Sequence, residues 1–406
     1  MDVKISMDLG ELKEKVKEIA LNNGAKLVGI GSQERLKEAP PSGDMNYTLP
    51  GAQSCIIWAI PTSFETLKNY FSKTERMSLA KEMYLAYSNA WKIAEEIAKF
   101  IEKNTEYKAH PVIPNGQYRL DDNKFRRKML FRLGRFALRL GFGKNIITKK
   151  LAETFGQQCL YPDFSLRYGA VAAGLGHLGF SGMLVTKEFG GALHLGGVLT
   201  TAPLEPDPMA EESNCNKCKL CVKVCNSGYF SKDEEDEPII IAGQKEIHAK
   251  RNTFGRCGVG CLGWCGLMPD GACSTWGVLP ISIANISEEN MKDQKFLQNL
   301  MKEMLFSKNT PKAHRNLNKK ILDEILRAGI QDNIGLRPLE DTNPRCNFCS
   351  GICVADFEQR KELFNLLKQS GTFSVDEKGK EFIRKMDESG NEIIYYPPTS
   401  IEIPRE

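Results

Sequence analysis

Seven cysteines, in two runs that lie far apart in the chain, have the spacing of ligands for iron–sulfur clusters. The first run, C-x2-C-x2-C-x3-C, is Cys215, Cys218, Cys221 and Cys225, and the second, C-x2-C-x3-C, is Cys346, Cys349 and Cys353. This spacing is typical of thiolates around a [4Fe-4S] cube, and the fourth cysteine of such a run can reach a second cube. Zinc sites usually show separate C-x2-C pairs, often with histidine. The pattern therefore predicts two [4Fe-4S] clusters rather than zinc.

Exchange of one cysteine between the two runs would divide the seven thiols into a set of four and a set of three. The first set is Cys215, Cys218, Cys221 and Cys353, and the second is Cys225, Cys346 and Cys349. The eighth ligand must come from elsewhere, and residues 254–273 supply the candidates Cys257, Cys261, Cys265 and Cys273. We expect Cys257, because it is the first of them after the strand-like PIIIA (238–242). The alternative is a third cluster held by these four cysteines, although their spacing matches no common cluster motif.

The positions after the two runs depart from the usual ferredoxin pattern. Asn226 and Val354 stand where proline is normal. Proline fixes the backbone angle φ, so we expect the turn after each run to be less constrained than usual.

The chain is long enough for a large core and for two or three domains, with 406 residues of which 41% are hydrophobic. Its formal charge of +4 neither demands nor excludes a nucleic-acid partner. The sequence has thirteen cysteines, and its first residues (MDVKISMDLGELKEK) show no apolar leader. Together these features predict reduced thiols and a cytoplasmic location. No apolar run approaches the roughly 20 residues that a membrane span requires.

The first half of the chain alternates predicted helices and strands. Helical spacing of apolar residues covers 9–23 and 78–103, and strand-like composition covers AKLVGIG (25–31), SCIIWAI (54–60), YKAHPVI (107–113) and ALHLGGVLTT (192–201). The nearly all-apolar SCIIWAI indicates a strand that is buried on both faces of a sheet. This alternation predicts an α/β layer architecture.

Residues 124–150 are strongly basic, with ten Lys or Arg and no Asp or Glu. Their apolar residues recur at intervals of three or four, which predicts an amphipathic helix interrupted by Gly134. These apolar residues are Phe125, Met129, Leu133, Phe136 and Leu140. Such a helix can meet RNA phosphates, an anionic membrane surface or an acidic redox partner. The plainer interpretation, which we favour, is an apolar face packed on the core and a solvated basic face.

Residues 174–197 are rich in glycine. Gly174-x-Gly176-x-x-Gly179 matches the dinucleotide-binding pattern, but a helical stretch (165–173) precedes it and strand-like MLVT (183–186) follows. A nucleotide fingerprint follows a strand and opens a helix, so we exclude nicotinamide binding here. Without side chains, these glycines would instead let backbone amides lie close to a large ligand.

Several stretches together resemble one superfamily, that of the epoxyqueuosine reductases and reductive dehalogenases. They are AGLGHLGFSGMLVTKEFGGALHLGGVLTTAPLEPD (173–207), CNKCKLCVKVC (215–225), CNFCSGIC (346–353), KLVGIGSQERL (26–36) and LPGAQSCIIWAIP (49–61). The likeness covers residues 10–265 and 340–356, and the glycine region and the cysteine runs are its most specific parts.

The resemblance implies a cobalamin bound base-off, without a lower histidine ligand, that receives electrons from the two clusters. No D-x-H-x-x-G motif is present, and His177 and His194, which flank the glycine region, are expected to make ordinary polar contacts. A low-potential cluster can reduce cobalt to Co(I), which attacks the substrate. The residues expected to contact the corrinoid are Gly174, Leu175, Gly176, Gly179, Gly182, Met183 and Gly196.

The resemblance also implies a division of the chain. We expect a nitroreductase-like α/β (α+β) domain for corrinoid and substrate over 1–205, and a ferredoxin-like 2[4Fe-4S] domain over 206–280 and 340–356. Residues 281–339 are expected as a helical insertion that caps the active site, forms a subunit contact or is a mere decoration. A helix and an extended tail are expected over 357–406.

The stretch ahead of the AGLG turn departs from the superfamily. Epoxyqueuosine reductases carry Asp-x-x-Pro-x-x-Glu there, with the aspartate as proton donor, whereas in CLYPDFSLRYG (159–169) Asp163 follows the proline. Dehalogenases use a tyrosine beside a basic residue, roles that Tyr161 and Arg167 could fill, because a nearby cation eases loss of a phenol proton. We expect Tyr161 rather than Asp163 as the acid. The alternative is that both residues only shape a turn.

These motifs favour a reductase that cleaves a carbon–heteroatom bond, most simply in a small molecule. Its electrons would come from a low-potential donor such as ferredoxin or flavodoxin. One alternative is a two-cluster electron-transfer protein without corrinoid. The other is an epoxyqueuosine reductase acting on tRNA, which the basic helix would permit but the missing Asp motif disfavours.

Overall fold

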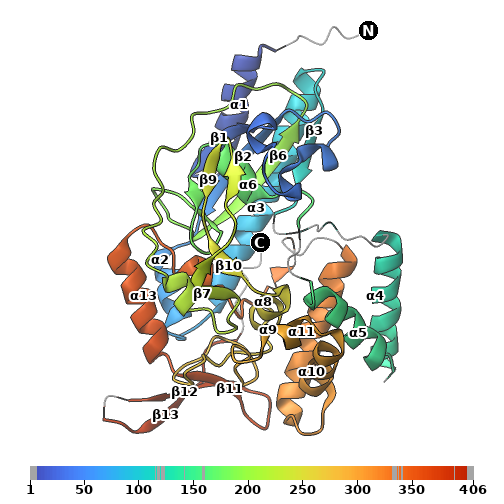
Figure 1. Cartoon of the computed structure of the whole chain (residues 1–406), viewed down its shortest axis with the longest axis vertical. Coiled ribbons are helices and arrows are strands. Elements are labelled where there is room, and N and C mark those ends of the chain that lie inside the picture. Colours follow the sequence, from blue (N-terminus) through green and yellow to red (C-terminus); the bar gives the residue numbers. More distant parts are fainter. Residues whose placement is uncertain are drawn as a thin grey trace, which may run out of the picture.

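The fold is described from a computed structural model of the chain (Figure 1). The structure describes residues 7–114, 116, 119, 124–140, 142–157, 161–331, 336, 338–339, 342–387 and 389–399. It describes the backbone alone at 124–128, 130–131, 139, 325 and 328–331. Within these ranges no helix is both long and apolar enough to cross a membrane.

A four-stranded antiparallel sheet forms the centre of the N-terminal half. Its strands, in spatial order, are β1 (Leu27–Ser32), β2 (Ser54–Pro61), β6 (Leu193–Thr200) and β3 (Ala109–Val112). Helices α1 (Leu9–Asn22) and α3 (Met77–Asn104) cover one face, and α6 (Leu166–Ala172) covers the other. The predicted strands and helices are confirmed, and the architecture is mixed α/β with antiparallel pairing.

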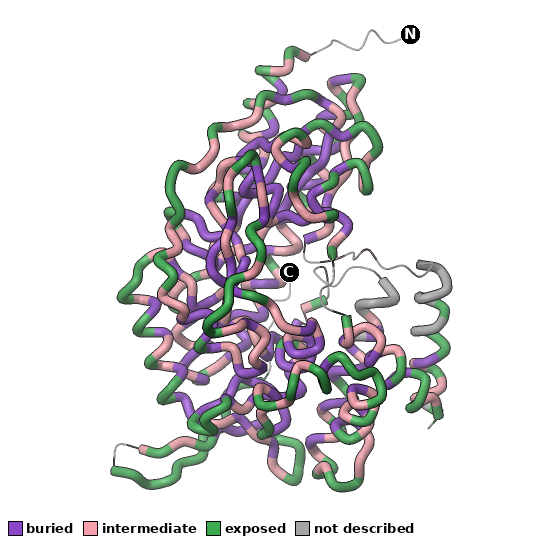
Figure 2. Tube along the Cα trace, viewed as in Figure 1, coloured by how far each residue is buried: buried purple, intermediate pink, exposed green. Residues whose placement is uncertain are grey.

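Strand β2 is buried on both faces, as its apolar sequence predicts. Ile56 and Trp58 pack in a cluster with α1 and α3, whereas Cys55 and Ile57 pack in a second cluster with α6. Successive side chains of a strand point to opposite faces, so one apolar run fills both layers. Figure 2 shows the sheet as part of the buried interior.

The cysteine runs lie in a part of the chain made of short elements, of which residues 230–235 and 249–261 lie below the sheet in Figure 1 and residues 239–246 lie beside it. These elements are α7 (Leu220–Lys223), α8 (Phe254–Cys261), α12 (Phe348–Gly351), β4 (His177–Leu178), β5 (Leu184–Val185), β7 (Phe230–Glu235), β8 (Ile239–Ile241), β9 (Gln244–Glu246) and β10 (Ala249–Arg251). Helix α2 (Phe64–Phe71) packs against α13 (Phe357–Gln369), which follows the second cysteine run. The first and last parts of the chain thus meet around the cysteines.

Five helices from two separate parts of the chain form one group at the edge of the molecule (Figure 1). They are α4 (Lys124–Arg139), α5 (Lys144–Phe155), α9 (Glu288–Lys292), α10 (Gln294–Phe306) and α11 (Lys312–Gln331). Helix α5 packs against α10, and α4 packs against α11. The expected helical insertion at 281–339 therefore shares its packing with the basic segment 124–150. The domain boundaries themselves stay a prediction.

Gly134 does not interrupt the basic helix, contrary to the prediction. Helix α4 runs through this position, and a Cβ there would overlap the side chain of Ile147 on α5. Gly134 therefore allows a close crossing of the two helices. The break falls at Gly143, which has a left-handed φ of 82° and precedes α5.

The C-terminal part holds a three-stranded antiparallel sheet, which the expectation of a helix and an extended tail does not include. The strands are β11 (Thr372–Val375), β12 (Glu381–Met386) and β13 (Glu392–Tyr395). Buried Glu381 of β12 pairs with Arg76, which precedes α3, and with Arg345, which precedes Cys346. The Nη2 of Arg345 lies 2.9 Å from Glu381 Oε1. This ion cluster ties three distant segments together beside the second cysteine run.

Candidate iron–sulfur centres

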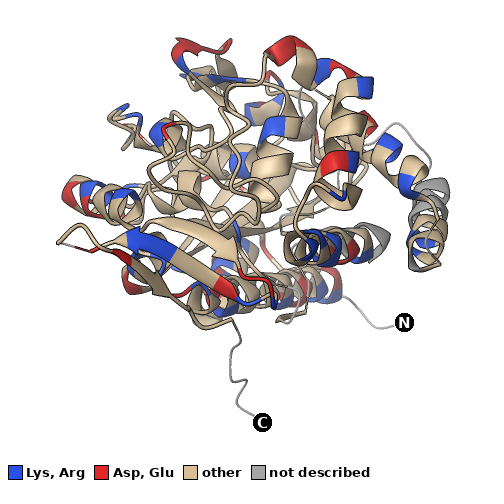
Figure 3. Ribbon diagram, turned by 90° about the horizontal axis from the view of Figure 1, so that it is seen from below, with Lys and Arg blue, Asp and Glu red and all other residues tan. Residues whose placement is uncertain are grey.

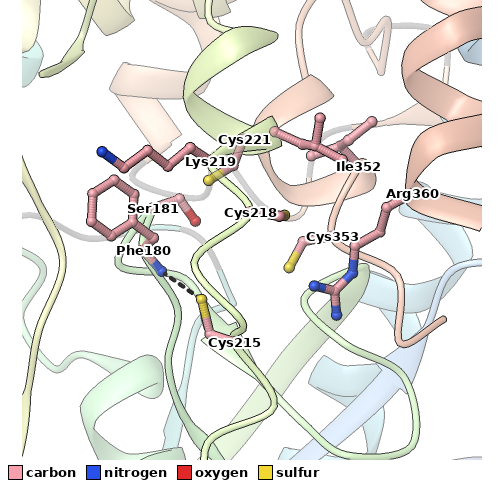
Figure 4. Close-up of a pocket in the computed structure, with 10 residues that line it drawn as sticks. Phe180, Ser181, Cys215, Cys218, Lys219, Cys221, Ile352, Cys353 and Arg360 are labelled. Atoms are coloured by element: carbon pink, nitrogen blue, oxygen red, sulfur yellow. Dashed lines mark hydrogen bonds between the residues drawn. The ribbon is translucent and has the colours of Figure 1, made fainter. Parts of the chain in front are cut away.

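The first cavity is lined by four cysteines from both runs. They are Cys215, Cys218, Cys221 and Cys353, the set that exchange between the runs predicts. The cavity has an empty volume of about 310 Å³, and Figure 4 shows the thiols of Cys215, Cys221 and Cys353 pointing toward a common space. Four converging thiols are the donor set that a [4Fe-4S] cluster requires.

Backbone contacts fix these thiols in place. The N–H of Phe180 donates to Cys215 Sγ at 3.3 Å (Figure 4), and such hydrogen bonds to sulfur tune cluster potentials. The loop between the first thiols turns through two non-glycine residues with left-handed φ, Lys217 at 51° and Lys219 at 58°. Such conformations are uncommon outside glycine and persist where the surrounding structure holds them.

Arg360 of α13 is a functional candidate that the cysteine motifs do not reveal. Its side chain lines the first cavity and points toward Cys353 (Figure 4). Its Nε donates to the carbonyl of Val354 at 2.5 Å, and its Nη1 to Asn216 Oδ1 at 3.3 Å. Arg360 therefore places a buried positive charge beside the first centre. The signal available in the sequence is one Arg seven residues after Cys353, within an ordinary amphipathic helix.

The second cavity is lined by five cysteines. They are Cys225, Cys257, Cys261, Cys346 and Cys349, around an empty volume of about 390 Å³. The expected eighth ligand Cys257 is among them, and Cys261, one helical turn further along α8, is an additional thiol. Cys261 Sγ lies 3.6 Å from the carbonyl of Cys346. Helix propensity does not predict α8, because five of the eight residues of FGRCGVGC are glycine or cysteine, which are poor helix formers.

The third-cluster alternative is wrong, because Cys265 and Cys273 lie apart from the second cavity. Cys265 is buried with its Sγ 3.5 Å from the sulfur of Met304. Cys273 is buried as well. Burial raises the pKa of its thiol, and the charge of nearby Lys73 acts in the opposite direction. Within the described ranges, no three His, Cys, Asp or Glu side chains form a site for a single metal ion. The cysteines surround two cavities instead.

Hydrogen bonds hold the two turns at which proline is missing, so those turns are not loosely constrained as expected. Asn226 is buried, and its Nδ2 donates to the carbonyl of Cys265 at 2.9 Å. The carbonyl of Val354 accepts the hydrogen bond from Arg360 described above. At the first turn the turn's own side chain binds a distant backbone carbonyl, and at the second a side chain six residues later binds the turn's carbonyl, so a hydrogen bond takes the place of proline at each.

The thiols need a metal to ionise. Burial, followed by the proximity of Cys353, Cys215 and Cys218, raises the pKa of Cys221 to about 12. Burial also raises the pKa of Cys353 to about 11, although the charge of Arg360 acts in the opposite direction. Metal ligation requires thiolates, so iron binding must release these protons. The mutual effects also show that the four thiols of the first cavity lie close together.

The glycine segment packs against protein at five of its predicted contact positions, and its role as a bed for a ligand stays a prediction. A Cβ at Gly174 would overlap the carbonyl of Pro208, and one at Gly176 would overlap that of Val185. The same holds for Gly179 against Val185, Gly182 against Arg251 and Gly196 against Trp58. Of the two other predicted cofactor contacts, Leu175 packs partly buried in the α6 cluster, and Met183 Sδ lies 3.5 Å from Arg167 Nη1. The glycines serve close packing of chain segments.

Both histidines beside the glycine segment make polar contacts, as expected. His177 Nδ1 lies 2.9 Å from Glu246 Oε1 and its Nε2 lies 3.2 Å from the carbonyl of Ala210. His194 is buried with its Nε2 3.2 Å from Thr62 Oγ1, and burial lowers its pKa to about 4. Each ring is thus engaged in packing within the protein.

The predicted acid residues lie ahead of α6. The Tyr161 side chain is 38% exposed, whereas Asp163 is 8% exposed. Arg167 donates to the carbonyl of Gly182 at 2.9 Å. Two residues that the motifs do not reveal lie near Asp163. Arg119 donates to the backbone carbonyl of Asp163 at 2.7 Å. Burial lowers the pKa of His110 on β3, and the charge of Asp163 acts in the opposite direction.

The fold and the two cavities define a mixed α/β protein with two cysteine-lined centres. No profile of a known protein family matches the chain. Epoxyqueuosine reductase of Listeria monocytogenes serovar 1/2a (strain ATCC BAA-679 / EGD-e) is 41% identical over 59 residues, which are 14% of this chain and 15% of that protein. That of Lactococcus garvieae (strain Lg2) is 35% identical over 79 residues, 19% of this chain and 22% of that protein. The matched stretches thus span less than a quarter of either relative.

Solved structures of the same superfamily align more widely but weakly. An epoxyqueuosine reductase with a tRNA-Tyr epoxyqueuosine-modified tRNA stem loop covers 89% of this chain and 100% of its own, at 14% identity and a TM-score of 0.35. The match to a reductive dehalogenase, whose structure suggests a mechanism for B12-dependent dehalogenation, covers 81% of this chain and 38% of the dehalogenase. Its sequence identity is 16% and its TM-score 0.42. Such scores are too low to support a conclusion about function.

The curated relatives confirm the resemblance that the cysteine and glycine motifs indicate. Short stretches of the chain are similar to curated epoxyqueuosine reductases, so the relatives that match are named as reductases.

Proposed function

We propose that the chain is an iron–sulfur reductase with one [4Fe-4S] cluster in each cavity. One observation carries this proposal: residues more than 120 positions apart converge as two sets of thiols, each drawing on both cysteine runs. The first cluster would be held by Cys215, Cys218, Cys221 and Cys353. The second would be held by Cys225, Cys346, Cys349 and one thiol of α8.

The two centres are adjacent, which supports electron transfer between them. Cys221 lines the first cavity and Cys225, four residues further, lines the second. The pKa of Cys349 in the second cavity is raised mainly by burial and in part by Cys221. Electrons from a low-potential donor such as ferredoxin or flavodoxin would therefore cross a short path. The clusters supply the electrons, and the protein orients and shields the acceptor.

The resemblance implies a cobalamin as the acceptor of these electrons, but the glycine segment does not fit that group as a bed. The Cβ directions at Gly174, Gly176 and Gly182 are filled by protein atoms. We therefore derive no step through a corrinoid. The same observation favours a second candidate function, a two-cluster electron-transfer protein without corrinoid.

The proton needed for reductive cleavage of a carbon–heteroatom bond requires an acid beside the acceptor. Tyr161 is our proposed donor, with Arg167 as the cation that promotes ionisation of its phenol. Asp163 is the alternative, with Arg119 bound to its backbone carbonyl.

The substrate class separates two further versions of this proposal. The names of the curated relatives point to a modified tRNA base, and the departure from their Asp motif points to a small molecule. Queuosine in tRNA of a deletion strain decides between them. Loss of queuosine with accumulation of its epoxide establishes the tRNA substrate, and an unchanged level removes it.

Anaerobic purification with analysis of iron, sulfide and cobalt tests the proposal. Two clusters require about eight iron atoms per chain. With about one cobalt per chain and corrinoid absorbance, the protein is a corrinoid reductase. The same iron content without cobalt makes it an electron-transfer protein, and less than half that iron overturns the two-cluster assignment.

A further inference from the structure

The apolar stripe of α4 faces solvent, which overturns our preferred interpretation of a core-facing helix. Leu133 is 56% exposed, Phe136 63% and Leu140 54%, and Met129 on the same face is exposed too. Phe142 and Ile146, at the turn into α5 and in its first residues, extend the stripe and are exposed. The side chain of Phe125 lies outside the described ones. We call Met129, Leu133, Phe136, Leu140, Phe142 and Ile146 the α4 stripe.

A different face of α4 attaches it to the protein. Gly134 is buried against Ile147, and Leu138 packs partly buried against the main core cluster. Arg135 forms a two-pronged pair with Asp323 of α11, at 2.5 and 3.0 Å. The helix is therefore anchored from behind while it presents the α4 stripe outward. Figure 1 places it at the edge of the molecule, and Figure 2 shows that much of its described length is exposed.

The segment that carries this stripe is basic in sequence. The ten Lys or Arg of residues 124–150 have no Asp or Glu among them, and Arg132, Lys144 and Lys149 are exposed beside the stripe. Elsewhere on the molecule, Lys and Arg are interspersed with Asp and Glu (Figure 3). A run of exposed Leu, Phe and Met within a basic segment that holds no acid matches a helix that lies in the interface of an anionic bilayer.

We propose that the α4 stripe and its flanking cations form a lipid-binding surface that seats the protein on an anionic membrane. The apolar side chains enter the boundary between headgroups and acyl chains, and the cations meet lipid phosphates. Contiguous apolar surface of this kind is uncommon on soluble proteins and marks an interaction site. This inference is independent of the proposed reductase activity.

Other occupants fit the surface less well. A second copy of the chain would bring two acid-free basic segments face to face, which costs charge repulsion. Nucleic acid would satisfy the cations but leave Leu133, Leu140 and Met129 with no apolar partner. An electron donor bound here would be remote from the clusters, because α4 packs on α5 and α11, and α5 lies between it and α8.

Vesicle co-sedimentation of the full, anaerobically purified chain tests the proposal. Vesicles of phosphatidylcholine and phosphatidylglycerol in equal parts are expected to bind the wild-type chain, and vesicles of phosphatidylcholine alone at least about tenfold less. The double variant Leu133→Ser, Phe136→Ser is expected to lose at least about tenfold in affinity for the anionic vesicles, because two large apolar side chains no longer leave water. Near-wild-type iron content shows that the variant is folded.

The matched control is Met386→Ser, Ile394→Ser, which removes two exposed apolar side chains from the C-terminal sheet and should bind as wild type does. A Phe136→Trp variant gives a second readout, with a blue-shifted emission quenched by brominated lipids. Three results overturn the proposal: no binding of the wild-type chain to anionic vesicles, unchanged binding of the Leu133, Phe136 variant, or a stable dimer that this variant dissociates. Binding to tRNA that is tighter than binding to anionic vesicles and unchanged in the Leu133, Phe136 variant also overturns it, in favour of an RNA surface.

Discussion

Gly191 donates its backbone N–H to the carbonyl oxygen of Cys353 at 2.5 Å. The glycine segment is thereby attached to the last cysteine of the second run. A Cβ at the preceding residue, Gly190, would overlap the same carbonyl, and Gly190 also has a left-handed φ of 66°. The two glycines therefore let the sheet-bearing part of the chain approach the first centre closely.

Gly190→Ala is expected to lose the first cluster, because the new methyl group would displace Cys353. Iron and sulfide analysis should show about half of the wild-type content. Gly243→Ala is the matched control: Gly243 has a similar φ of 75°, but a Cβ there meets nothing within 4 Å. If both variants lose the same amount of iron, backbone strain rather than the contact with Cys353 is responsible.

Single replacements on α8 identify the eighth ligand. We expect Cys257→Ala to lose the second cluster and Cys261→Ala to keep it, since the second cavity holds five thiols for four corners. Cys265→Ala, outside the cavity, controls for the loss of a buried thiol. The readouts are iron content and the electron paramagnetic resonance spectrum of the reduced protein. The opposite result for Cys257 and Cys261 would transfer the assignment to Cys261.

Arg360→Gln is expected to lower the reduction potential of the first cluster. A cation beside the cluster favours its more negative, reduced form, and a unit charge at this range is worth on the order of 100 mV. Arg360→Lys keeps the charge and should keep most of the potential. A redox titration followed by electron paramagnetic resonance measures both. Equal potentials in the wild type and the Gln variant would show that the charge is screened.

Glu381 gives the stability a defined pH dependence. Burial alone would raise its pKa, but Arg345 and Arg76 outweigh burial and lower the pKa from 4.5 to about 2. The carboxylate therefore contributes stability above pH 4.5, and the contribution falls by about 1.4 kcal/mol per pH unit as the pH drops toward 2.

Glu381→Gln tests this contribution by leaving two buried guanidinium groups unpaired. We expect a loss of about 3–5 kcal/mol at pH 7. The difference between wild type and variant in urea unfolding should shrink between pH 5 and pH 3. A difference that does not vary with pH would assign the effect to packing. Glu392→Gln, at an exposed pair with Arg384, should change stability little.

Tyr161→Phe is expected to keep both clusters and to lose at least about a hundredfold in turnover, as removal of a general acid does. Asp163→Asn is the comparison. Turnover is measured with a chemical reductant, on the substrate that the deletion strain identifies. Normal turnover of the Phe variant together with loss in the Asn variant would assign the acid to Asp163.

The sequence predicts the elements with local signals and misses those that depend on distant partners. The apolar run of β2 and the cysteine spacing are such local signals, and strand and thiols lie where they indicate. Cys261 is missed because glycine-rich α8 lacks helical propensity. The C-terminal sheet is missed because prolines in the tail argue against strands, although β13 ends at Tyr395, before them.

The glycine segment shows a further limit. A glycine that admits a ligand and one that admits another chain segment look alike in sequence. Only the structure shows that Gly174 faces Pro208 and Gly190 faces Cys353. The α4 stripe is misjudged for a similar reason, because periodicity finds an apolar face and cannot say whether protein covers it.

The long separation between the two cysteine runs has a consequence for biogenesis. Cys215 leaves the ribosome 138 residues before Cys353 (353 minus 215), the last thiol of the same centre. Neither centre can be completed before the second cysteine run has left the ribosome, so iron delivery must follow synthesis of that run. Until then, the thiols of the first run have no metal bound and are open to oxidation. Expression hosts that assemble iron–sulfur clusters well and grow with little oxygen should therefore yield more holoprotein than hosts chosen for fast translation.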